Sequence, residues 1–583
     1  MKYKIINENI LEKPLLDIIM ENRNILHIPL EDFLKPTRKF ELNMYDLINF
    51  KESILKFKEK YKDNKYIKVG IIWDCDCDGF TSGAFLYNFL HENFPTIELV
   101  IYFHSGKAHG ISDDIKLDED LDLLFVVDGG SNDYEQHKEL KNKGLDIIIL
   151  DHHSCDRLSE DAIVVNNKLS EAYSNKNLSG VGIVYKYCLG LAKEFKIAKK
   201  QVDKFLDLVA IGNIGDSMDM RELETRYYAI KGLKKINNPL IKQIIKKREF
   251  DMKGEINFYT VAFYIVPLFN AIARVGTKED KEIMIKALIS DETVMVDYKK
   301  RGQTEPIKVT IQEEATRLMS NAKSRQDTQK KKGVEILSPL VERDPSKIVL
   351  IDTTELKVKG ECSGLIANVL GSTYRKPIML YGLVGDKFIG SARGWGVERF
   401  KTDCANSNLF EWVEGHEGAF GFCIKADNIE KVKEYFNEFY AEKDFISEKN
   451  YNIDKPFSIY ELDKKTVMEV GKYKSLWSKG IDEPLFLIED IRINKKDIEL
   501  KVIGKEKRIN FRYGDIFFNK RFSNEEEFEE FTCKDRNSFG NDYCLDIKVI
   551  GKFTKNTWKK SYAVVEIIDF ESKKVSVEET LYF

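Results

Sequence analysis

Between residues 66 and 167 the chain repeats one pattern: a short, almost continuously apolar run, a polar or glycine break, and a helix-compatible segment. The apolar runs are KVGIIW (68–73), IELVIYF (97–103), LLFVVD (123–128), LDIIIL (145–150) and AIVVNN (162–167). Strands with so few polar positions are typical of a parallel sheet that helices cover on both faces. The pattern therefore predicts an α/β fold, and we assign residues 55–290 to this domain.

The rest of the chain divides into four further parts. Residues 1–54 form an N-terminal segment, and a charged stretch at 291–345 predicts a long connecting helix that ends near Gly333. Residues 346–445 mix strands and helices, which indicates a second, smaller α/β domain. Closely spaced strands separated by turn signals at 446–583 predict a small β-barrel or sandwich, with an oligonucleotide-binding barrel as one option.

Composition limits the class of protein. A chain of 583 residues with 43% apolar residues can fill several cores, so it is expected to be multidomain. No run reaches the roughly 18 apolar residues of a membrane span, and the first residues lack an apolar signal core, so we expect a soluble, cytoplasmic protein. Nine cysteines without a CxxC pair argue against a disulfide framework and a zinc ribbon. The net charge of −4 means that any contact with a polyanion must be local.

The segment Asp74-Cys75-Asp76-Cys77-Asp78-Gly79 follows the first of these strands directly and precedes a helical segment. Three carboxylates within five residues repel one another unless a cation or a hydrogen-bond network neutralises them. A metal site explains the segment economically, while a solvated acidic loop is the simpler alternative. The two cysteines are expected to point away from the metal, because side chains of an extended segment alternate.

Two further strands end in residues of the same chemical kind. LLFVVD ends at Asp128, and the fourth run is followed by Asp151-His152-His153. Because ligands of an open parallel sheet collect outside the carboxyl ends of its strands, these side chains are expected to converge in one crevice. Carboxylates and imidazole suit Mn²⁺ or Mg²⁺, and two such ions about 4 Å apart support phosphoester hydrolysis.

The order of these motifs resembles the phosphoesterase motifs of the DHH superfamily, continued by SGVG (179–182) and DLVAIGNIGDSM (207–218). PLFNAIARVG (267–276), GSARGWG (390–396) and EGHEGAFG (414–421) are similar to segments of RecJ nucleases, the last two to their DHHA1 domain. The C-terminal strands resemble the oligonucleotide-binding barrel of that family. The resemblance covers about residues 65–575.

The resemblance implies a role for each matching residue. The implied metal ligands are Asp74, Asp76, Asp78, Asp128, His152 and Asp216. Asp128 and His152 also count among the catalytic residues, together with Asp151, which would orient an imidazole, and His153, which would contact the phosphate or leaving group. From its local sequence alone, Asp216 would be a solvated or helix-capping aspartate.

The resemblance also implies contacts with nucleic acid. Ser391, Arg393 and His416 match positions that bind the strand and its terminal phosphate, although a hairpin turn and a structural histidine are the alternatives. Arg274 and Lys107 are further candidate phosphate contacts. Half of the aromatic residues of the basic C-terminal strands are expected to face the barrel core, because side chains of a strand alternate, and Trp558 is the best candidate for stacking on a base.

Three departures from the family pattern bear on substrate binding more than on metal binding. Glu414 stands where a glycine is usual, Asn213 replaces a small hydroxyl residue, and the second strand lacks a proline-asparagine-arginine sequence.

The resemblance implies a two-metal exonuclease that hydrolyses single-stranded DNA from the 5′ end and releases mononucleotides in repair, recombination or replication. Single-stranded DNA is the expected partner, and a single-strand-binding protein or a helicase is a further candidate. The enzyme is expected to be a monomer that binds no membrane. A phosphodiesterase for short oligonucleotides or cyclic dinucleotides is the enzymatic alternative. A non-catalytic replication scaffold of the same fold is the other alternative.

Overall fold

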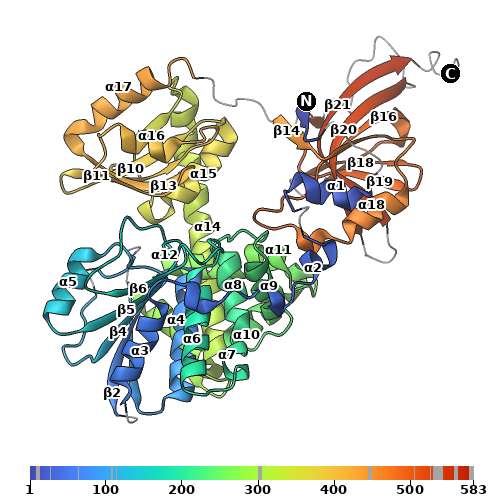
Figure 1. Cartoon of the computed structure of the whole chain (residues 1–583). Helices are drawn as coiled ribbons and strands as arrows, with labels where there is room; N and C mark the ends of the chain where they lie inside the picture. The colour runs from blue at the N-terminus through green and yellow to red at the C-terminus, as the bar shows by residue number, and fades with distance from the viewer. Residues whose placement is uncertain are drawn as a thin grey trace. The chain divides into compact units, whose positions relative to one another are not determined.

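The chain is described by a computed structural model that divides it into two compact units (Figure 1). One unit comprises residues 38–218 and 224–447, and the other comprises 1–37, 219–223 and 448–583. The described residues are 1–7, 13–25, 28–62, 65–104, 106, 109–112, 115–299, 302, 305–443, 450–503, 506–524, 527–528, 543–556 and 562–576.

The larger unit contains the predicted parallel sheet. Its five strands are all parallel and lie in the order β3-β2-β4-β5-β6. They are β2 (Ile67–Trp73), β3 (Ile97–Phe103), β4 (Leu123–Val127), β5 (Asp146–Asp151) and β6 (Ile163–Asn166). Each coincides with one of the apolar runs, which confirms the predicted α/β fold.

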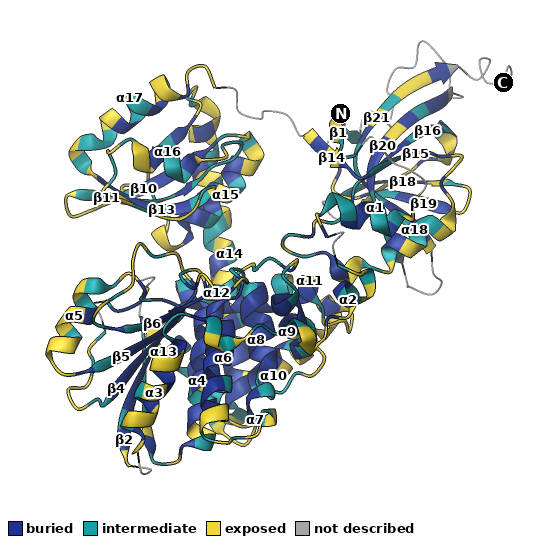
Figure 2. Ribbon diagram, viewed as in Figure 1, coloured by how far each residue is buried: buried dark blue, intermediate teal, exposed yellow. Residues whose placement is uncertain are grey.

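Helices pack against this sheet (Figure 1): α3 (Phe50–Lys60), α4 (Cys77–Asn93), α5 (Tyr134–Asn142) and α6 (Gly180–Glu194). Along the chain they are followed by α7 (Lys200–Asp203), α8 (Leu206–Gly215), α9 (Leu223–Leu233) and α10 (Pro239–Met252). Helices α4, α6 and α8 pack against one another and are buried over most of their length (Figure 2). Helices that are apolar all round belong in a domain core.

The strand order reverses at the centre of the sheet. After β2 the chain adds β3 on one side and then returns to place β4 on the other side of β2. Such a reversal leaves a gap outside the carboxyl ends of the two central strands, where α/β proteins bind ligands. Asp74 follows β2 and Asp128 follows β4, so both lie at this reversal point.

The connection to the smaller α/β domain differs from the prediction. After α11 (Phe258–Thr260), η4 (Val261–Ile265), α12 (Val266–Val275) and α13 (Lys278–Ile289), the strands β7 (Met295–Tyr298) and β8 (Ile307–Thr310) pair as antiparallel neighbours. The connecting helix is α14 (Ile311–Arg343), and it does not end near Gly333. A Cβ at Gly333 would lie 2.4 Å from Ile366, so this glycine lets α15 (Ser363–Tyr374) pack closely instead of ending the helix.

The smaller α/β domain is a five-stranded sheet in the order β12-β13-β11-β10-β9. Its strands are β9 (Val349–Asp352), β10 (Ile378–Val384), β11 (Lys387–Arg393), β12 (Trp412–His416) and β13 (Ala419–Lys425). Two further helices are α16 (Phe400–Asn406) and α17 (Ile429–Phe439). Val275, at the end of α12, packs against the core of this domain.

The C-terminal unit contains a seven-stranded mixed sheet in the order β15-β16-β20-β21-β19-β18-β17, which is compatible with an oligonucleotide-binding domain. The strands are β15 (Lys455–Ser458), β16 (Phe486–Asn494), β17 (Glu499–Ile503), β18 (Glu506–Tyr513), β19 (Ile516–Lys520), β20 (Tyr543–Asn556) and β21 (Tyr562–Ser576), and α18 (Lys464–Gly471) packs on β20 and β21.

Residues 1–37 belong to this C-terminal unit and residues 38–54 to the larger one, so the separate N-terminal segment predicted at 1–54 is wrong. Strand β1 (Lys2–Ile5) pairs in parallel with β14 (Asn450–Ile453), and α1 (Leu15–Asn22) and α2 (Leu30–Leu34) follow it. At the end of α1, Arg23 forms an ion pair with Asp454 that is almost fully buried. Pairing between segments so far apart in the chain leaves no local pattern in the sequence.

Within the described residues, one helical segment, Phe258–Val275, is long and apolar enough to cross a membrane. It is 56% buried inside the structure, which is typical of the core helix of a domain.

The Arg23–Asp454 pair generates a prediction about stability. Asp454 also accepts hydrogen bonds from Asn22 (2.9 Å) and from the backbone of Leu485 (3.1 Å), so it joins α1 to the sheet. Arg23→Ala would leave a buried carboxylate without its cation, which costs about 3–5 kcal/mol. We expect faster amide hydrogen exchange in β14 and β15 of the full chain.

The matched control is Lys13→Ala, which removes a more exposed ion pair with Glu21 in the same segment. Equal exchange rates in the two variants would contradict the structural role of Arg23.

Candidate metal centre and phosphate site

The acidic loop after β2 is organised by the start of α4. Asp76 caps this helix, and its carboxylate accepts a hydrogen bond from the backbone of Gly79 at 3.0 Å. Asp74 and Asp78 are buried, with exposures of 3% and 1%. A Cβ at Gly79 would lie 2.4 Å from the carbonyl oxygen of Asp74, so the tight turn requires glycine. The loop thus holds three carboxylates close together, two of them buried and the third, that of Asp76, half-buried.

The carboxylate of Asp78 is held by the N-terminus of α6. Gly180 donates its backbone N–H to Oδ2 at 2.6 Å, and the Ser179 hydroxyl and the Val181 N–H donate to Oδ1 at 3.0 and 3.3 Å. Unpaired N–H groups and the helix dipole at this end stabilise a negative charge. The SGVG motif therefore orients one of the candidate metal ligands.

Asn213 supports the same arrangement. It is fully buried, accepts a hydrogen bond from the Ser179 N–H at 3.2 Å and donates one to the carbonyl of Val209 at 2.9 Å. Asn213 stands where the family usually has a small hydroxyl residue. In this structure its side chain holds Ser179, the residue before the first turn of α6.

Asp128 lies at the end of β4 in a left-handed backbone conformation, with φ of 61°. Aspartate and asparagine adopt this conformation more readily than other residues with a side chain. Gly180 lies directly against it, because a Cβ there would be 2.4 Å from Asp128 Oδ1. Both features bring the carboxylate into the space between β2, β4 and α6.

The two histidines after β5 have different environments. Asp151 Oδ1 binds Nδ1 of His153 at 2.8 Å and accepts the backbone N–H of His152 at 2.7 Å. Burial alone would raise the pKa of Asp151, but the charge and hydrogen bond of His153 lower it. Partial enclosure would lower the pKa of His153, but the charge and hydrogen bond of Asp151 raise it to about 10. His153 is therefore a cation.

His152 is neutral by contrast. Burial, followed by the charge of His153, lowers its pKa to about 3. Its Nε2 lies 3.2 Å from Asp128 Oδ1, 3.4 Å from Asp216 Oδ2 and 3.9 Å from Asp78 Oδ2. A neutral imidazole among carboxylates is the form that binds a metal ion.

The carboxyl groups of this cluster resist ionisation in the absence of a cation. Burial and the neighbouring carboxylates raise the pKa of Asp78 to about 6 and that of Asp216 to about 8. The same two causes raise the pKa of Asp76 and Asp128. Asp216 is the residue that follows the last turn of α8, and its carboxylate lies 3.4 Å from Nε2 of His152.

Unsatisfied polar atoms test whether a metal ion fits this cluster. Among the described residues, Asp128 Oδ1 and both ring nitrogens of His152 are buried without a hydrogen-bond partner. Buried polar atoms are rarely left unpaired, so these atoms need a partner that the protein does not supply. The donors are oxygens and one imidazole, which suit Mn²⁺ or Mg²⁺.

The donor atoms fall into groups within 4.8 Å of one another. One group is Asp78, His152 and Asp216, and a second is Asp74, Asp76 and Asp128. A third combines Asp128 and His152 with His153, but the protonated His153 is a poor ligand. The structure therefore brings all six predicted ligands into two adjacent groups.

The two cysteines of the loop point away from the carboxylates, as expected. The Cys75 thiol donates to the carbonyl of His104 at 3.0 Å, and Cys77 packs against Gly215. The buried ammonium of Lys281 donates to the same His104 carbonyl at 3.3 Å, so this carbonyl holds both Lys281 and the Cys75 thiol of the loop.

His109 is a residue of this site that the sequence did not indicate. Its Nδ1 lies 2.8 Å from Asp74 Oδ2, and this hydrogen bond, with the charge of Asp74, raises the pKa of His109 to about 9. It lies in the connection between β3 and β4, where no regular pattern marks it. Lys107, the residue predicted in this connection, lies outside the described residues.

A pair of arginines lies beside the acidic cluster. Burial lowers the pKa of Arg393 on β11, and the charge of Arg274 on α12 lowers it further. Burial also lowers the pKa of Arg274, whose charge interacts with Asp76. Two guanidinium groups close enough to repel each other are suited to binding an anion such as phosphate, so the pair is a candidate anion site.

The start of α15 completes this anion site. Ser363 and Ser391 share a hydrogen bond of 2.9 Å between their hydroxyls. A Cβ at Gly364 would lie 2.5 Å from a guanidinium nitrogen of Arg393, so this glycine makes room for the arginine. The sequence predicted Arg274, Ser391 and Arg393, but not the contribution of the Ser363-Gly364 turn.

The remaining predicted contacts are less closely defined. His416 ends β12, and its charge is among those that lower the pKa of His152, so it faces the same site. Trp558 lies outside the described residues. In the C-terminal unit Phe511, Phe518 and Phe553 are buried and belong to the core, whereas Tyr513 and Phe517 are half-buried.

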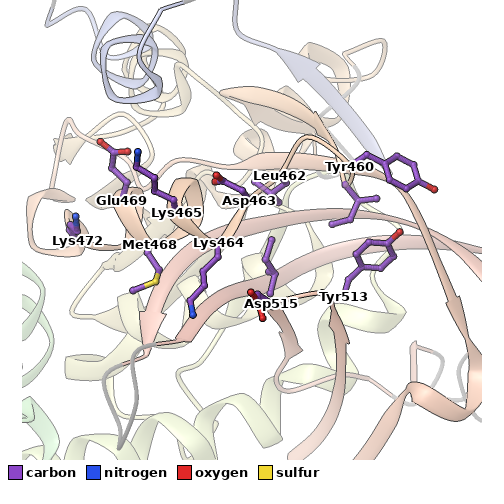
Figure 3. Close-up of a pocket in the computed structure, with 13 residues that line it drawn as sticks. Tyr460, Leu462, Asp463, Lys464, Lys465, Met468, Glu469, Lys472, Tyr513 and Asp515 are labelled. Atoms are coloured by element: carbon purple, nitrogen blue, oxygen red, sulfur yellow. The ribbon is translucent and has the colours of Figure 1, made fainter.

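The C-terminal unit contains an open groove between α18 and the β18–β19 turn (Figure 3). Tyr460 and Tyr513 lie together at one end, and lysines line the remainder with acidic residues between them. The lysines are Lys464, Lys465 and Lys472.

Comparisons with known proteins agree with this geometry. Residues 68–213 match the model of the DHH family, N-terminal domain. The chain is 36% identical over 595 residues to "Putative SPbeta prophage-derived single-strand DNA-specific exonuclease YorK" of Bacillus subtilis strain 168, with 100% of both chains covered. It is 24% identical over 538 residues to the single-stranded-DNA-specific exonuclease RecJ of the same organism, covering 88% of this chain and 62% of that protein.

The crystal structure of RecJ from Thermus thermophilus in complex with Mn²⁺ superposes with a TM-score of 0.72 at 17% identity. The superposition covers 97% of this chain and 76% of that chain. It establishes a common fold for the two proteins.

The raised carboxyl pKa values predict how stability depends on pH and metal. In the unfolded chain Asp216 ionises near its ordinary pKa of 3.8, but in the metal-free fold only near 8. The folded state therefore loses stability as the pH rises between these values. Asp216→Asn removes this titration, so in EDTA its melting temperature should exceed that of wild type by more near pH 9 than near pH 5.

Mn²⁺ should reverse the order, because only the wild-type site keeps its full ligand set. Melting curves with the same pH dependence for both proteins, or with no response to Mn²⁺, would contradict the metal site.

Proposed function

The chain belongs to the RecJ-like exonucleases of the DHH family, and from this premise we propose that it is a metal-dependent exonuclease acting on single-stranded DNA. We further propose that it degrades the strand from the 5′ end, releases mononucleotides and serves DNA repair, recombination or replication.

One observation supports the hydrolytic activity most strongly. The buried, unpaired atoms of Asp128 and His152 lie at the carboxyl edge of the sheet, and the arginine pair approaches the same edge from α12 and β11. A cation-binding group beside an anion-binding group is suited to a phosphodiester, whose charge must be held while the phosphorus is attacked.

In this proposal the two ligand groups, Asp78 with His152 and Asp216, and Asp74 with Asp76 and Asp128, would hold two divalent ions. When bound, the ions would activate water and neutralise charge on the attacked phosphate. A Mn²⁺ or Mg²⁺ ion accepts these oxygen and nitrogen ligands without any thiolate, which fits the outward direction of the two cysteines.

Other residues act on the substrate directly. The cationic His153 is 52% exposed, so its free Nε2–H can donate a hydrogen bond to the phosphate or to the leaving oxygen. Asp151 keeps the ring protonated and oriented. Arg274 and Arg393 hold the phosphate from the opposite side, and Ser391 and His416 contact the strand.

The C-terminal groove supports a substrate longer than a dinucleotide. Tyrosines beside lysines provide stacking surfaces and positive charge for a single strand. A phosphodiesterase limited to dinucleotides has no use for a separate unit of this kind.

The activity is tested by incubating the protein and Mn²⁺ with a single strand labelled at its 5′ end. A matched duplex and a dinucleotide serve as competing substrates. We expect labelled mononucleotide as the first product from the single strand, and none from Asp128→Asn, in which the amide keeps the left-handed backbone but cannot replace the carboxylate.

The control is Asp118→Asn, which changes an exposed aspartate paired with Lys68 and should leave the activity intact. Cleavage of the dinucleotide alone would indicate the small-substrate enzyme instead. No cleavage that depends on Asp128 would indicate a non-catalytic scaffold.

The two adjacent histidines should separate metal binding from catalysis. His152→Ala removes a neutral ligand from the cluster, so it should weaken Mn²⁺ binding measured by calorimetry. His153→Ala should leave Mn²⁺ binding nearly unchanged and lower kcat by about a hundredfold or more, the usual effect of losing a proton donor.

Equal losses of Mn²⁺ affinity in the two variants would contradict the separate roles. Their shared position after β5 makes each variant the control for the other.

A further inference from the structure

Two large aromatic side chains are exposed on the helical segment that carries Arg274. Tyr259 is 45% exposed and Phe263 is 61% exposed. Their ring centroids lie 4.5 Å apart at an interplanar angle of 33°. Two adjacent exposed rings are an unusual surface feature of a soluble domain and commonly mark a binding surface.

The rings and the arginine share the accessible face of one continuous helical segment. The segment comprises α11, the π-helical turn η4 and α12, from Phe258 to Val275. Its accessible face contains Tyr259, Phe263, Pro267, Asn270 and Arg274 at helical spacing. Apart from Ala262 and Tyr264, the other residues between Tyr259 and Arg274 are buried. The helical spacing and the burial of the remaining residues therefore indicate the same accessible face.

The segment fixes the distance between the rings and the phosphate site. With a rise of about 1.5 Å per residue, Phe263 lies about 16 Å and Tyr259 about 22 Å from Arg274 along the helix. At about 3.4 Å per stacked nucleotide, the first of these distances corresponds to about five nucleotides. A strand whose end is held by Arg274 can therefore reach both rings, whereas a dinucleotide cannot.

The charge beside the rings also fits a nucleic acid. Helix α10 packs against η4, and residues 239–253 contain five cationic side chains and two acidic ones. Lys246, Lys247 and Lys253 are exposed. Positive charge next to aromatic faces is the combination by which proteins hold single strands without reading their sequence.

We propose that the accessible face of residues 259–274 is a track for single-stranded nucleic acid that leads from the phosphate site at Arg274 to a stacking platform formed by Tyr259 and Phe263. Bases about five nucleotides from the held end stack on the two rings. The cations of α10 lie along the backbone. This inference rests on the proposed single-strand exonuclease activity and adds where the strand runs.

The test compares the double variant Tyr259→Ala/Phe263→Ala with wild type on a ten-nucleotide strand and on a dinucleotide. On the longer strand KM should rise about tenfold or more, the effect of losing base stacking. On the dinucleotide kcat/KM should be unchanged, because this substrate does not reach the rings, and the unchanged value also shows that the variant is folded.

Single variants separate stacking from apolar packing. Phe263→Trp keeps an aromatic face and should retain the wild-type KM on the ten-nucleotide strand. Phe263→Leu keeps apolar area without a ring and should raise the KM. Tyr66→Ala removes an exposed ring at the amino end of β2, whereas the site lies at the carboxyl ends of the strands, and should leave the KM on the ten-nucleotide strand unchanged.

An unchanged KM of the double variant on the longer strand would overturn the track and indicate that the rings serve another surface contact. A Phe263→Leu variant with wild-type kinetics would overturn base stacking. The activity of the wild-type protein separates this inference from the proposed function. If the wild-type protein does not cleave the single strand, the proposed exonuclease is contradicted. If it does and the double variant has the same KM, only the track is contradicted.

Discussion

Mutual repulsion among buried carboxylates is the constraint on which the rest of this structure depends. Asp76, Asp78, Asp128 and Asp216 occupy one small space, and each has a pKa raised by burial and by its neighbours. A fold tolerates such a cluster only when something offsets the repulsion. The N-terminus of α6 does so for Asp78, and we propose that divalent cations do so for the others.

The architecture provides both the place and the counter-charge. The strand order reverses between β2 and β4, and acidic residues that follow three separate strands meet at one edge of the sheet. Cationic side chains also lie at this edge. Asp151 keeps His153 protonated, and the charges of Arg274 and Arg393 repel each other. We propose that the site is divided accordingly into a part that binds cations and a part that binds phosphate.

Much of this could be predicted from the sequence because the information is local. A buried parallel strand is a short apolar run, and the residue after it marks the ligand edge, so the strands and the acidic residues were identified together. The features that were missed depend on contacts between distant segments. His109 reaches Asp74 from an irregular connection, β1 pairs with β14 across most of the chain, and Gly333 serves helix packing where its residue type suggested a helix end.

The central claim is that the carboxylate cluster is a two-ion site, and anomalous X-ray scattering from crystals grown with Mn²⁺ tests it most directly. The account predicts two anomalous peaks about 4 Å apart, one among Asp78, His152 and Asp216 and the other among Asp74, Asp76 and Asp128. Crystals without a peak at these side chains, or with manganese bound only elsewhere on the protein, would contradict it.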